Sequence, residues 1–237
     1  MDISTSVALV TGANRGIGRE FARILVERGA TVYATARHPE SIDLEGVRAL
    51  QLDITDPESV AAVAAAAPNV SLLINNAGIT TGADLVSGNL EKIRLELDTH
   101  FWGTLSMTRA FAPVLAANGG GAIVNVLSAL SWFTIPGTGS YHVAKAAEWA
   151  LTNSARSELA AQGTTVTGVH LGAANTDMMR GYDGPKVSPT AVVEAALAGV
   201  EAKAAEVLVD DWSRFIKAGV AGEPEPFYEG VRAALAG

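Results

Sequence analysis

The sequence alternates short β-branched segments with longer helical segments along nearly its whole length. Strands are expected at residues 7–10, 31–35, 47–52, 70–75, 122–127, 165–171 and 207–209, and helices at 16–27, 57–66, 90–117, 139–161 and 189–203. Parallel strands need a crossover connection, usually a helix, so this alternation predicts a sheet covered by helices on both faces. The predicted fold class is therefore α/β, a doubly wound parallel sheet of about seven strands.

Chain length and the lack of internal breaks predict a single domain over residues 1–237. The 237 residues are 49% hydrophobic, which allows a substantial buried core. Residues 218–237, which begin with a segment rich in Gly, Pro and Glu, are expected to form a tail or a small clasp. Within 90–117, apolar residues at steps of three or four from Leu90 to Phe111 predict a buried helical stripe.

Charge and residue usage exclude several classes of function. The chain has 17 Lys and Arg against 25 Asp and Glu, a net charge of −8, so its surface repels phosphate backbones and anionic membranes. It has no cysteine, which excludes disulfides, thiolate metal sites and a cysteine nucleophile, and no histidine spacing indicates a metal site. Its start lacks the pattern of a signal peptide. We expect a soluble, cytoplasmic protein that binds no nucleic acid, membrane or metal.

A glycine-rich turn follows the first expected strand and opens the first expected helix. Residues 11–18 read Thr-Gly-Ala-Asn-Arg-Gly-Ile-Gly, so that Gly12, Gly16 and Gly18 have the spacing Gly-x3-Gly-x-Gly. Glycine lets the backbone turn sharply and approach a pyrophosphate, whose charge is met by the amides at the helix start. At this place in an alternating chain the turn predicts a nucleotide site.

The end of the second expected strand indicates which dinucleotide binds. NAD-specific sites place an acidic residue there to accept a hydrogen bond from the ribose 2′-hydroxyl, whereas residues 35–37 read Thr-Ala-Arg. Arg37 can clamp a 2′-phosphate with its planar guanidinium, and Arg15 adds a second cation on the same side. Each arginine alone is equally well explained as a solvated surface charge. Together they favour NADP(H).

A second candidate site lies further along the chain. Tyr141 and Lys145 have the i, i+4 spacing that puts a phenol and an ammonium on one helix face. A positive charge stabilises phenolate and brings the pKa of a proton-transferring tyrosine closer to working pH. Ser128 ends the preceding expected strand, where parallel sheets place their ligands, and its hydroxyl could hold a carbonyl oxygen.

Together these residues resemble the short-chain dehydrogenase/reductase family over almost the whole chain. Residues 75–78 read Asn-Asn-Ala-Gly, a family signature, and Ser128, Tyr141 and Lys145 match the catalytic serine, tyrosine and lysine in order and spacing. The resemblance implies a single-domain Rossmann fold. It places at the cofactor Gly12, Asn14, Arg15, Gly16, Ile17, Gly18, Arg37, Asp53, Ile54, Asn76, Ala77, Gly78, Tyr141, Lys145, Ala174 and Thr176.

The sequence departs from the family pattern at two places. His100 replaces an asparagine whose backbone carbonyl, in the family, holds a water that relays protons to the lysine. His100 is therefore a fourth catalytic candidate: it either keeps the carbonyl and replaces the asparagine passively, which we favour, or brings a titrating imidazole to the site. Leu171-Gly172 replaces the usual Pro-Gly and is expected to loosen that turn.

The expected function is that of an NADPH-dependent carbonyl reductase, working reversibly as an alcohol dehydrogenase on a mostly apolar ketone or secondary alcohol. The expected substrate lining is Leu130, Trp132, Phe133, Ile135, Met178, Met179 and Tyr182. The alternatives are an epimerase or dehydratase of the same family, or an NADP-sensing binding protein without turnover. The resemblance also implies a homo-oligomer, a tetramer or dimer, paired through the helices at 90–117 and 139–161.

Overall fold

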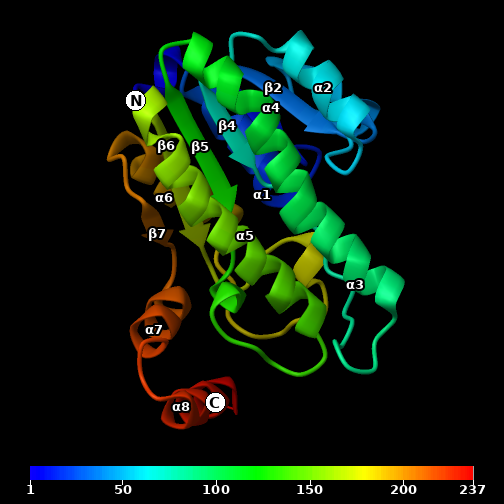
Figure 1. Cartoon of the computed structure of the whole chain (residues 1–237), viewed down its shortest axis with the longest axis vertical. Helices are drawn as coiled ribbons and strands as arrows, with labels where there is room; N and C mark the ends of the chain where they lie inside the picture. Colours follow the sequence, from blue (N-terminus) through cyan, green and yellow to red (C-terminus); the bar gives the residue numbers. More distant parts are fainter. Residues whose placement is uncertain (237) are drawn as a thin grey trace.

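The structure, a computed structural model, describes residues 1–236 and confirms the predicted fold class. Its strands are β1 (Val7–Thr11), β2 (Thr31–Ala36), β3 (Val47–Gln51), β4 (Leu72–Asn75), β5 (Gly121–Val126), β6 (Thr164–His170) and β7 (Glu206–Leu208). Its α-helices are α1 (Gly16–Glu27), α2 (Pro57–Ala66), α3 (Leu90–Leu97), α4 (Thr104–Ala117), α5 (Gly139–Glu158), α6 (Pro189–Glu201), α7 (Asp211–Gly219) and α8 (Pro224–Ala236). The strands pair in parallel in the order β3-β2-β1-β4-β5-β6-β7 (Figure 1).

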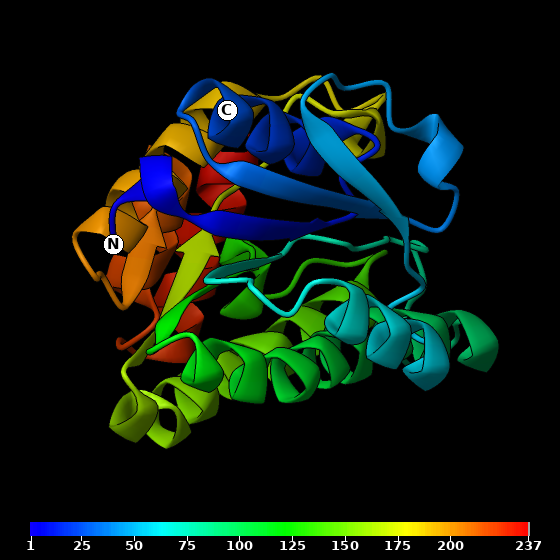
Figure 2. The ribbon, with the colours of Figure 1, turned by 90° about the horizontal axis from the view of Figure 1, so that it is seen from above.

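Helices cover both faces of the sheet (Figure 2). On one face α1 and α6 pack together, with Phe21 and Leu197 in the same apolar cluster as Val10 of β1. On the other face Phe111 of α4 packs in a second cluster with Leu9 of β1. Successive residues of a strand point to opposite faces, so strands β1 to β6 contribute to both clusters and the sheet is buried on both sides.

The order of the strands reverses between β1 and β4, and hydrogen bonds close that junction. The Thr11 hydroxyl accepts hydrogen bonds from the backbone amides of Asn76 and Ala77 at 2.9 and 3.0 Å. The side-chain amide of Asn76 donates to the Thr11 carbonyl at 2.9 Å. Connections leave β1 and β4 in opposite directions here, which opens a crevice at the carboxyl ends of the strands.

The expected helix at 90–117 is interrupted by a π-helical turn, Asp98–Gly103, between α3 and α4. The predicted buried stripe is wrong at its start: Leu90 is exposed, whereas Glu96, Thr99 and His100 are buried. A π turn takes one more residue than an α turn and so shifts the face that follows it. The polar side faces α5 and is buried because α3 and the π turn pack against that helix.

Two helices that the sequence did not predict, α7 and α8, follow β7 and lie at the end of the molecule away from the N-terminus (Figure 1). Phe227, Tyr228 and Val231 of α8 pack in one apolar cluster with Phe133 and with Ile216 of α7. The described part of residues 218–237 is therefore mostly helical. The single domain, the clasp and the homo-oligomer stay predictions.

Candidate active site

A cleft of about 580 Å³ opens where the strand order reverses. Most of the residues that the resemblance places at the cofactor line it, namely Gly12, Asn14, Arg15, Gly16, Ile17, Arg37, Asp53, Ile54, Asn76, Ala77, Gly78, Tyr141, Lys145 and Thr176. His100 lines it as well. Gly18, Ala174 and Ser128 lie outside this lining, and all three are buried; Ser128 lies two residues after the end of β5.

The glycine turn needs glycine for two physical reasons. Gly12 and Gly16 have φ of +66° and +56°, in the left-handed region that side chains rarely adopt. A Cβ on Gly18 would overlap the carbonyl oxygen of Gly12 and the side-chain amide of Asn76. The first turn of α1 therefore lies directly against the end of β1, with its free amides turned to the cleft. This cradle fits a pyrophosphate.

The arginines predicted to recognise a 2′-phosphate are exposed at the cleft. Arg15 and Arg37 both line it, and in the described part of the chain neither forms an ion pair with a carboxylate. Ala36, the last residue of β2, directly precedes Arg37, so this strand end carries no acid. The pair can therefore offer two guanidinium groups to one phosphate, and the residues present fit NADP(H) better than NAD(H).

Tyr141 lies half-buried near the start of α5, beside the carboxyl end of β5. Burial raises the pKa of Tyr141 above its ordinary value; the charge of Lys145 lowers it, the carboxylate of Glu148 raises it, and a hydrogen bond with Ser128 lowers it. The Lys145 ammonium is 5.9 Å from the centre of the phenol ring. The sequence predicts that Lys145 brings the pKa of Tyr141 closer to working pH; its charge acts in that direction but does not outweigh burial, so the pKa is raised overall.

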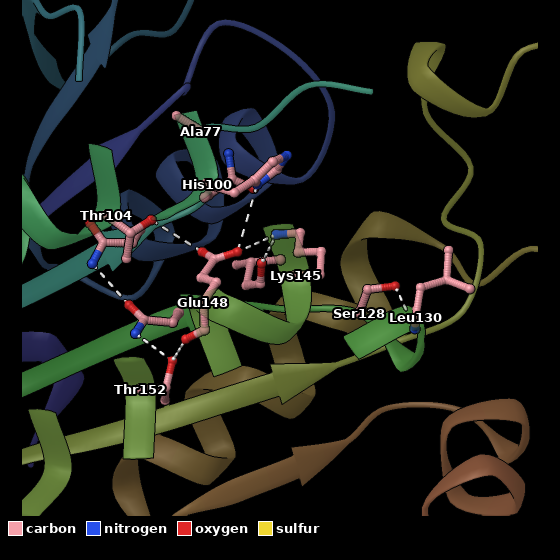
Figure 3. Close-up of polar contacts among 12 residues, drawn as sticks. Ala77, His100, Thr104, Ser128, Leu130, Lys145, Glu148 and Thr152 are labelled. Atoms are coloured by element: carbon pink, nitrogen blue, oxygen red, sulfur yellow. Dashed lines mark hydrogen bonds and ion pairs between the residues drawn. The ribbon is translucent and has the colours of Figure 1, made fainter. Parts of the chain in front are cut away.

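Ser128 lies two residues after the end of β5, and its neighbours hold it with its hydroxyl hydrogen available. Its Oγ accepts a hydrogen bond from the backbone amide of Leu130 at 3.1 Å (Figure 3). Its carbonyl oxygen lies 3.0 Å from Nδ1 of His170, a buried imidazole stacked on Trp132 with 3.8 Å between ring centres. Burial lowers the pKa of His170 to about 4, so this ring is neutral and donates from Nδ1.

His100 occupies the π turn and is almost fully buried, with 1% of its surface exposed. Its Nε2 lies 2.8 Å from the carbonyl oxygen of Ile79, and its ring meets the Tyr141 ring edge-on at 5.3 Å. A Cβ on Gly78 would come within 2.6 Å of Cε1 of His100, so the last glycine of the Asn-Asn-Ala-Gly signature makes room for the imidazole.

Glu148 belongs to this site, and the sequence does not single it out. Its Oε2 accepts a hydrogen bond from Lys145 Nζ at 2.7 Å and lies 3.6 Å from Nδ1 of His100. Its Oε1 accepts one from the Thr104 hydroxyl at 3.2 Å (Figure 3). The sequence signal for Glu148 is its i, i+3 spacing to Lys145. Ion pairs on exposed helix surfaces have the same spacing, so it does not identify a buried site residue.

Lys145 and Glu148 set each other's charge. Burial by itself lowers the pKa of Lys145, but the charges of Glu148 and Tyr141 outweigh it and the pKa is raised. Burial by itself raises the pKa of Glu148, but Lys145 and His100 outweigh it and the pKa is lowered. Lys145 Nζ also donates to the carbonyl of Val126 at 2.8 Å. The pair is therefore ionised within the protein interior.

The predicted substrate lining is largely wrong. Phe133 is buried against Trp212, with ring centres 5.6 Å apart, and Trp132 stacks on His170. Leu130, Trp132 and Ile135 pack against the cluster formed with α7 and α8. Of the seven predicted residues only Met178 lines the cleft. These aromatic residues are core because two helices absent from the sequence prediction cover them.

His142, a further histidine near the site, holds two loops together. The His142 ring nitrogens lie 2.7 Å from the Phe133 carbonyl and 2.8 Å from the Thr138 hydroxyl, so the ring ties the segment after β5 to α5.

Within residues 1–236 no group of three His, Cys, Asp or Glu is placed to hold a metal ion. No helix in this described part is long and apolar enough to cross a membrane.

Several known proteins are similar to this chain in sequence and in fold. The family model described as short chain dehydrogenase matches residues 6–185. The 3-oxoacyl-acyl-carrier-protein reductase FabG of Vibrio cholerae is 33% identical over 76% of this chain and 78% of its own. The NADPH-dependent 1-acyldihydroxyacetone phosphate reductase of Schizosaccharomyces pombe is 36% identical over 71% of this chain and 60% of its own.

A crystal structure covers the whole architecture. It is that of a short chain dehydrogenase from Burkholderia cenocepacia in complex with NADP, which is 38% identical to this chain with a TM-score of 0.92. The alignment covers 99% of both chains. The likeness therefore includes the C-terminal region that lies beyond the family model.

Proposed function

Because the chain belongs to the short-chain dehydrogenase/reductase family, we propose that it is an NADP(H)-dependent carbonyl reductase, acting reversibly on a mostly apolar ketone or secondary alcohol. The observation that carries this proposal is the Lys145 ammonium 5.9 Å from the centre of the Tyr141 ring, in the same cleft as the glycine turn. A phenol that holds its proton at neutral pH is a general acid, which is what carbonyl reduction requires.

NADP(H) is the cofactor that the cleft fits. The Burkholderia protein was solved with NADP; in this cleft Gly12 and Gly16 would hold the pyrophosphate, and Arg15 and Arg37 would meet the 2′-phosphate. Asp53 and Ile54 line the part of the cleft proposed for the adenine, and Thr176 the part proposed for the carboxamide. Reduced cofactor supplies the hydride; the protein supplies the proton and the orientation.

The proposed acid and its partners have separate tasks. The Ser128 hydroxyl accepts from the Leu130 amide and can therefore donate its own hydrogen to the substrate oxygen, which polarises the carbonyl. Tyr141 gives its phenolic proton to that oxygen as the carbon accepts hydride, leaving tyrosinate. The Lys145 ammonium stabilises the tyrosinate. Its four-carbon stem is buried beside the cleft, so the same ammonium can also hold the ribose.

The proposal of an apolar substrate rests on a smaller set of residues than the sequence suggests. Ile79 and Met178 line the cleft near Tyr141, and exposed Leu85 lies against Gly139, two residues before the tyrosine. Among the described residues, Lys145 is the only arginine or lysine that lines the cleft near Tyr141, and it is buried. This end of the cleft therefore offers no exposed cation to an anionic substrate group.

The direct test follows NADPH absorbance in the presence of a panel of aryl and alkyl ketones, with product identification. Net oxidation of NADPH with formation of a secondary alcohol is the expected result, because one cleft holds both the proposed dinucleotide cradle and the proposed acid Tyr141. Product without net oxidation would instead assign an epimerase or dehydratase, and NADPH binding with no product would assign a sensing protein.

Tyr141→Phe tests the acid. The substitution should lower kcat at least about 100-fold, since only the proton donor is lost, and leave the affinity for NADPH within about twofold. Steady-state rates and NADPH fluorescence titration measure the two effects. Tyr33→Phe, at a tyrosine bonded to Asn69 away from the cleft, is the matched control and should change neither. A loss under tenfold would mean that another group donates the proton.

The double variant Ala36→Asp, Arg37→Ser tests cofactor choice. A carboxylate would then face the 2′-phosphate in place of a guanidinium, so the ratio of kcat/KM for NADPH over NADH should fall by at least about tenfold. Arg37→Lys keeps the charge but loses the planar fork and should give an intermediate ratio. Equal use of NADH and NADPH by the unmodified protein would contradict the assignment.

His100→Asn separates the two roles open to His100. We expect the variant to keep or raise kcat with an unchanged pH profile, because the substitution retains the backbone carbonyl and the Ser128, Tyr141 and Lys145 set stays complete. Rates across pH, with thermal unfolding to show that the variant is folded, measure this. A drop in kcat of tenfold or more, together with loss of a titration from the profile, would assign proton transfer to the imidazole.

A further inference from the structure

His170, the last residue of β6, is fully buried and touches the backbone of Ser128. Its Nδ1 lies 3.0 Å from the Ser128 carbonyl oxygen. A carbonyl oxygen only accepts hydrogen bonds, so Nδ1 carries the hydrogen and donates it. Ser128 follows β5, the strand that pairs with β6. A side chain of one strand therefore holds the chain of the next strand at a proposed active-site residue.

The Ser128 carbonyl is also part of a short turn that holds the Ser128 hydroxyl. It accepts a second hydrogen bond, from the Ser131 backbone amide at 3.0 Å, which closes a 3-10 turn over Ala129–Ser131. The Ser128 hydroxyl oxygen accepts from the Leu130 amide of the same turn at 3.1 Å (Figure 3). Carbonyl and hydroxyl are thus joined through one turn, so a group that fixes the carbonyl also fixes the direction of the hydroxyl.

The imidazole of His170 is itself held in place by stacking. Its ring lies 3.8 Å from the ring centre of Trp132, with 16° between the planes. The Lys217 ammonium lies 4.5 Å from the same Trp132 ring and pairs with Glu206 at 2.9 Å. His170 Nε2 is 3.6 Å from the Glu206 carboxylate, too far for a hydrogen bond, and has no hydrogen-bond partner among the described residues. The one hydrogen bond of the ring therefore goes to Ser128.

Packing by itself does not call for an imidazole at this position. The Ser128 carbonyl already accepts from Ser131, so without His170 it would not be left without a partner. The space beside Trp132 and Gly168 could be filled by an apolar side chain, which costs less to bury than a polar ring. What the imidazole adds is the Nδ1 hydrogen at the Ser128 carbonyl.

We propose that His170 is a positioning residue: its Nδ1 hydrogen fixes the Ser128 carbonyl and, through the turn that follows, the direction in which the Ser128 hydroxyl donates to the substrate oxygen. The role rests on the proposed function, in which Ser128 polarises the carbonyl. A hydroxyl that turns away loses its alignment with the charge that develops on that oxygen. The cost should therefore appear in kcat and not in cofactor binding.

His170→Asn and His170→Leu form a matched pair of variants. The two new side chains have nearly the same shape, and both lose the stacking on Trp132. Only the Asn amide nitrogen, which stands as far along the side chain as Nδ1, can donate to Ser128. His170→Leu should lower kcat for ketone reduction about tenfold and leave KM for NADPH within about twofold, whereas His170→Asn should keep kcat within about threefold of the unmodified protein.

Thermal unfolding of the same two variants separates position from stability. Leu is the more apolar side chain at a fully buried position, so His170→Leu should unfold at the same temperature as His170→Asn or at a higher one. Activity should then follow the hydrogen-bond donor and not the stability. An equal loss of kcat in both variants, or a larger loss in His170→Asn, would overturn the proposal.

Lys217→Met is the control for the surrounding cluster. It removes the cation from the Trp132 ring without removing any contact of Ser128, and it should keep kcat within about twofold. A loss as large as that in His170→Leu would assign the effect to the packing of the cluster and not to the hydrogen bond, which would also overturn the proposal.

Two measurements need neither ketone nor cofactor. Hydrogen exchange in the cofactor-free protein should be at least about tenfold faster at the Ser131 amide in His170→Leu than in His170→Asn, because the turn loses its anchor. If the variants do not fold, nitrogen NMR of the unmodified protein decides: the hydrogen of the neutral His170 ring should lie on Nδ1, and a hydrogen on Nε2 contradicts the proposal.

These measurements keep the role of His170 apart from the proposed function. They stand even if no ketone is reduced, because they report the contact with Ser128 directly. Reductase activity with an unchanged kcat in His170→Leu would remove only the role of His170.

Discussion

The ammonium of Lys145 is buried between two acceptors, the carbonyl oxygen of Val126 and the carboxylate of Glu148, and the catalytic half of the cleft is arranged around it. Burying a charge costs desolvation free energy, which neighbouring groups of opposite charge or suitably oriented dipoles must offset. Val126 is the last residue of β5, and Glu148 lies about one turn after Lys145 on α5. The hydrogen bond from Lys145 to Val126 therefore joins α5 to the carboxyl end of the sheet, and the hydrogen bond to Glu148 stays within the helix. The phenol of Tyr141 is placed by the same helix.

A ladder of buried side-chain hydrogen bonds extends this arrangement across the sheet. The Thr152 hydroxyl donates to the Glu148 carbonyl at 2.7 Å and accepts from the Asn125 amide at 2.8 Å. The Asn75 amide donates in turn to Asn125 at 2.9 Å. The two asparagines of the Asn-Asn-Ala-Gly signature therefore do different things: Asn75 joins β4 to β5 and α5, while Asn76 joins β4 to β1.

The cleft is electrostatically divided. At its cofactor end, exposed Arg15 and Arg37 stand without a carboxylate partner in the described residues, ready for a phosphate that arrives with the ligand. At its catalytic end, Lys145 is already paired by Glu148 before any ligand binds. The first half offers solvated charge to a ligand, and the second holds a buried, balanced ion pair beside Tyr141.

The predicted substrate lining is wrong at its aromatic residues for one reason. Trp132 and Phe133 follow Ser128 in the sequence, where the pattern predicts a substrate pocket, but they pack with α7 and α8 instead. The start of α7 is fixed by a capping box between Asp210 and Ser213, a local signal that the sequence did contain. Their apolar side chains are buried by tertiary contact, which local pattern cannot report.

By itself the sequence determined the alternation of strands and helices, the parallel sheet, the glycine turn with its two arginines, and the order of Ser128, Tyr141 and Lys145. These are local: periodicity, backbone conformations that only glycine adopts, and residues one helical turn apart. The tertiary structure decided that His100 sits in a π turn, that Glu148 is buried rather than solvated, and that the pKa of Tyr141 is raised. The physical reason is that burial and charge pairing arise where three elements from distant parts of the chain pack together. The residue spacing within one element does not show which other elements pack against it.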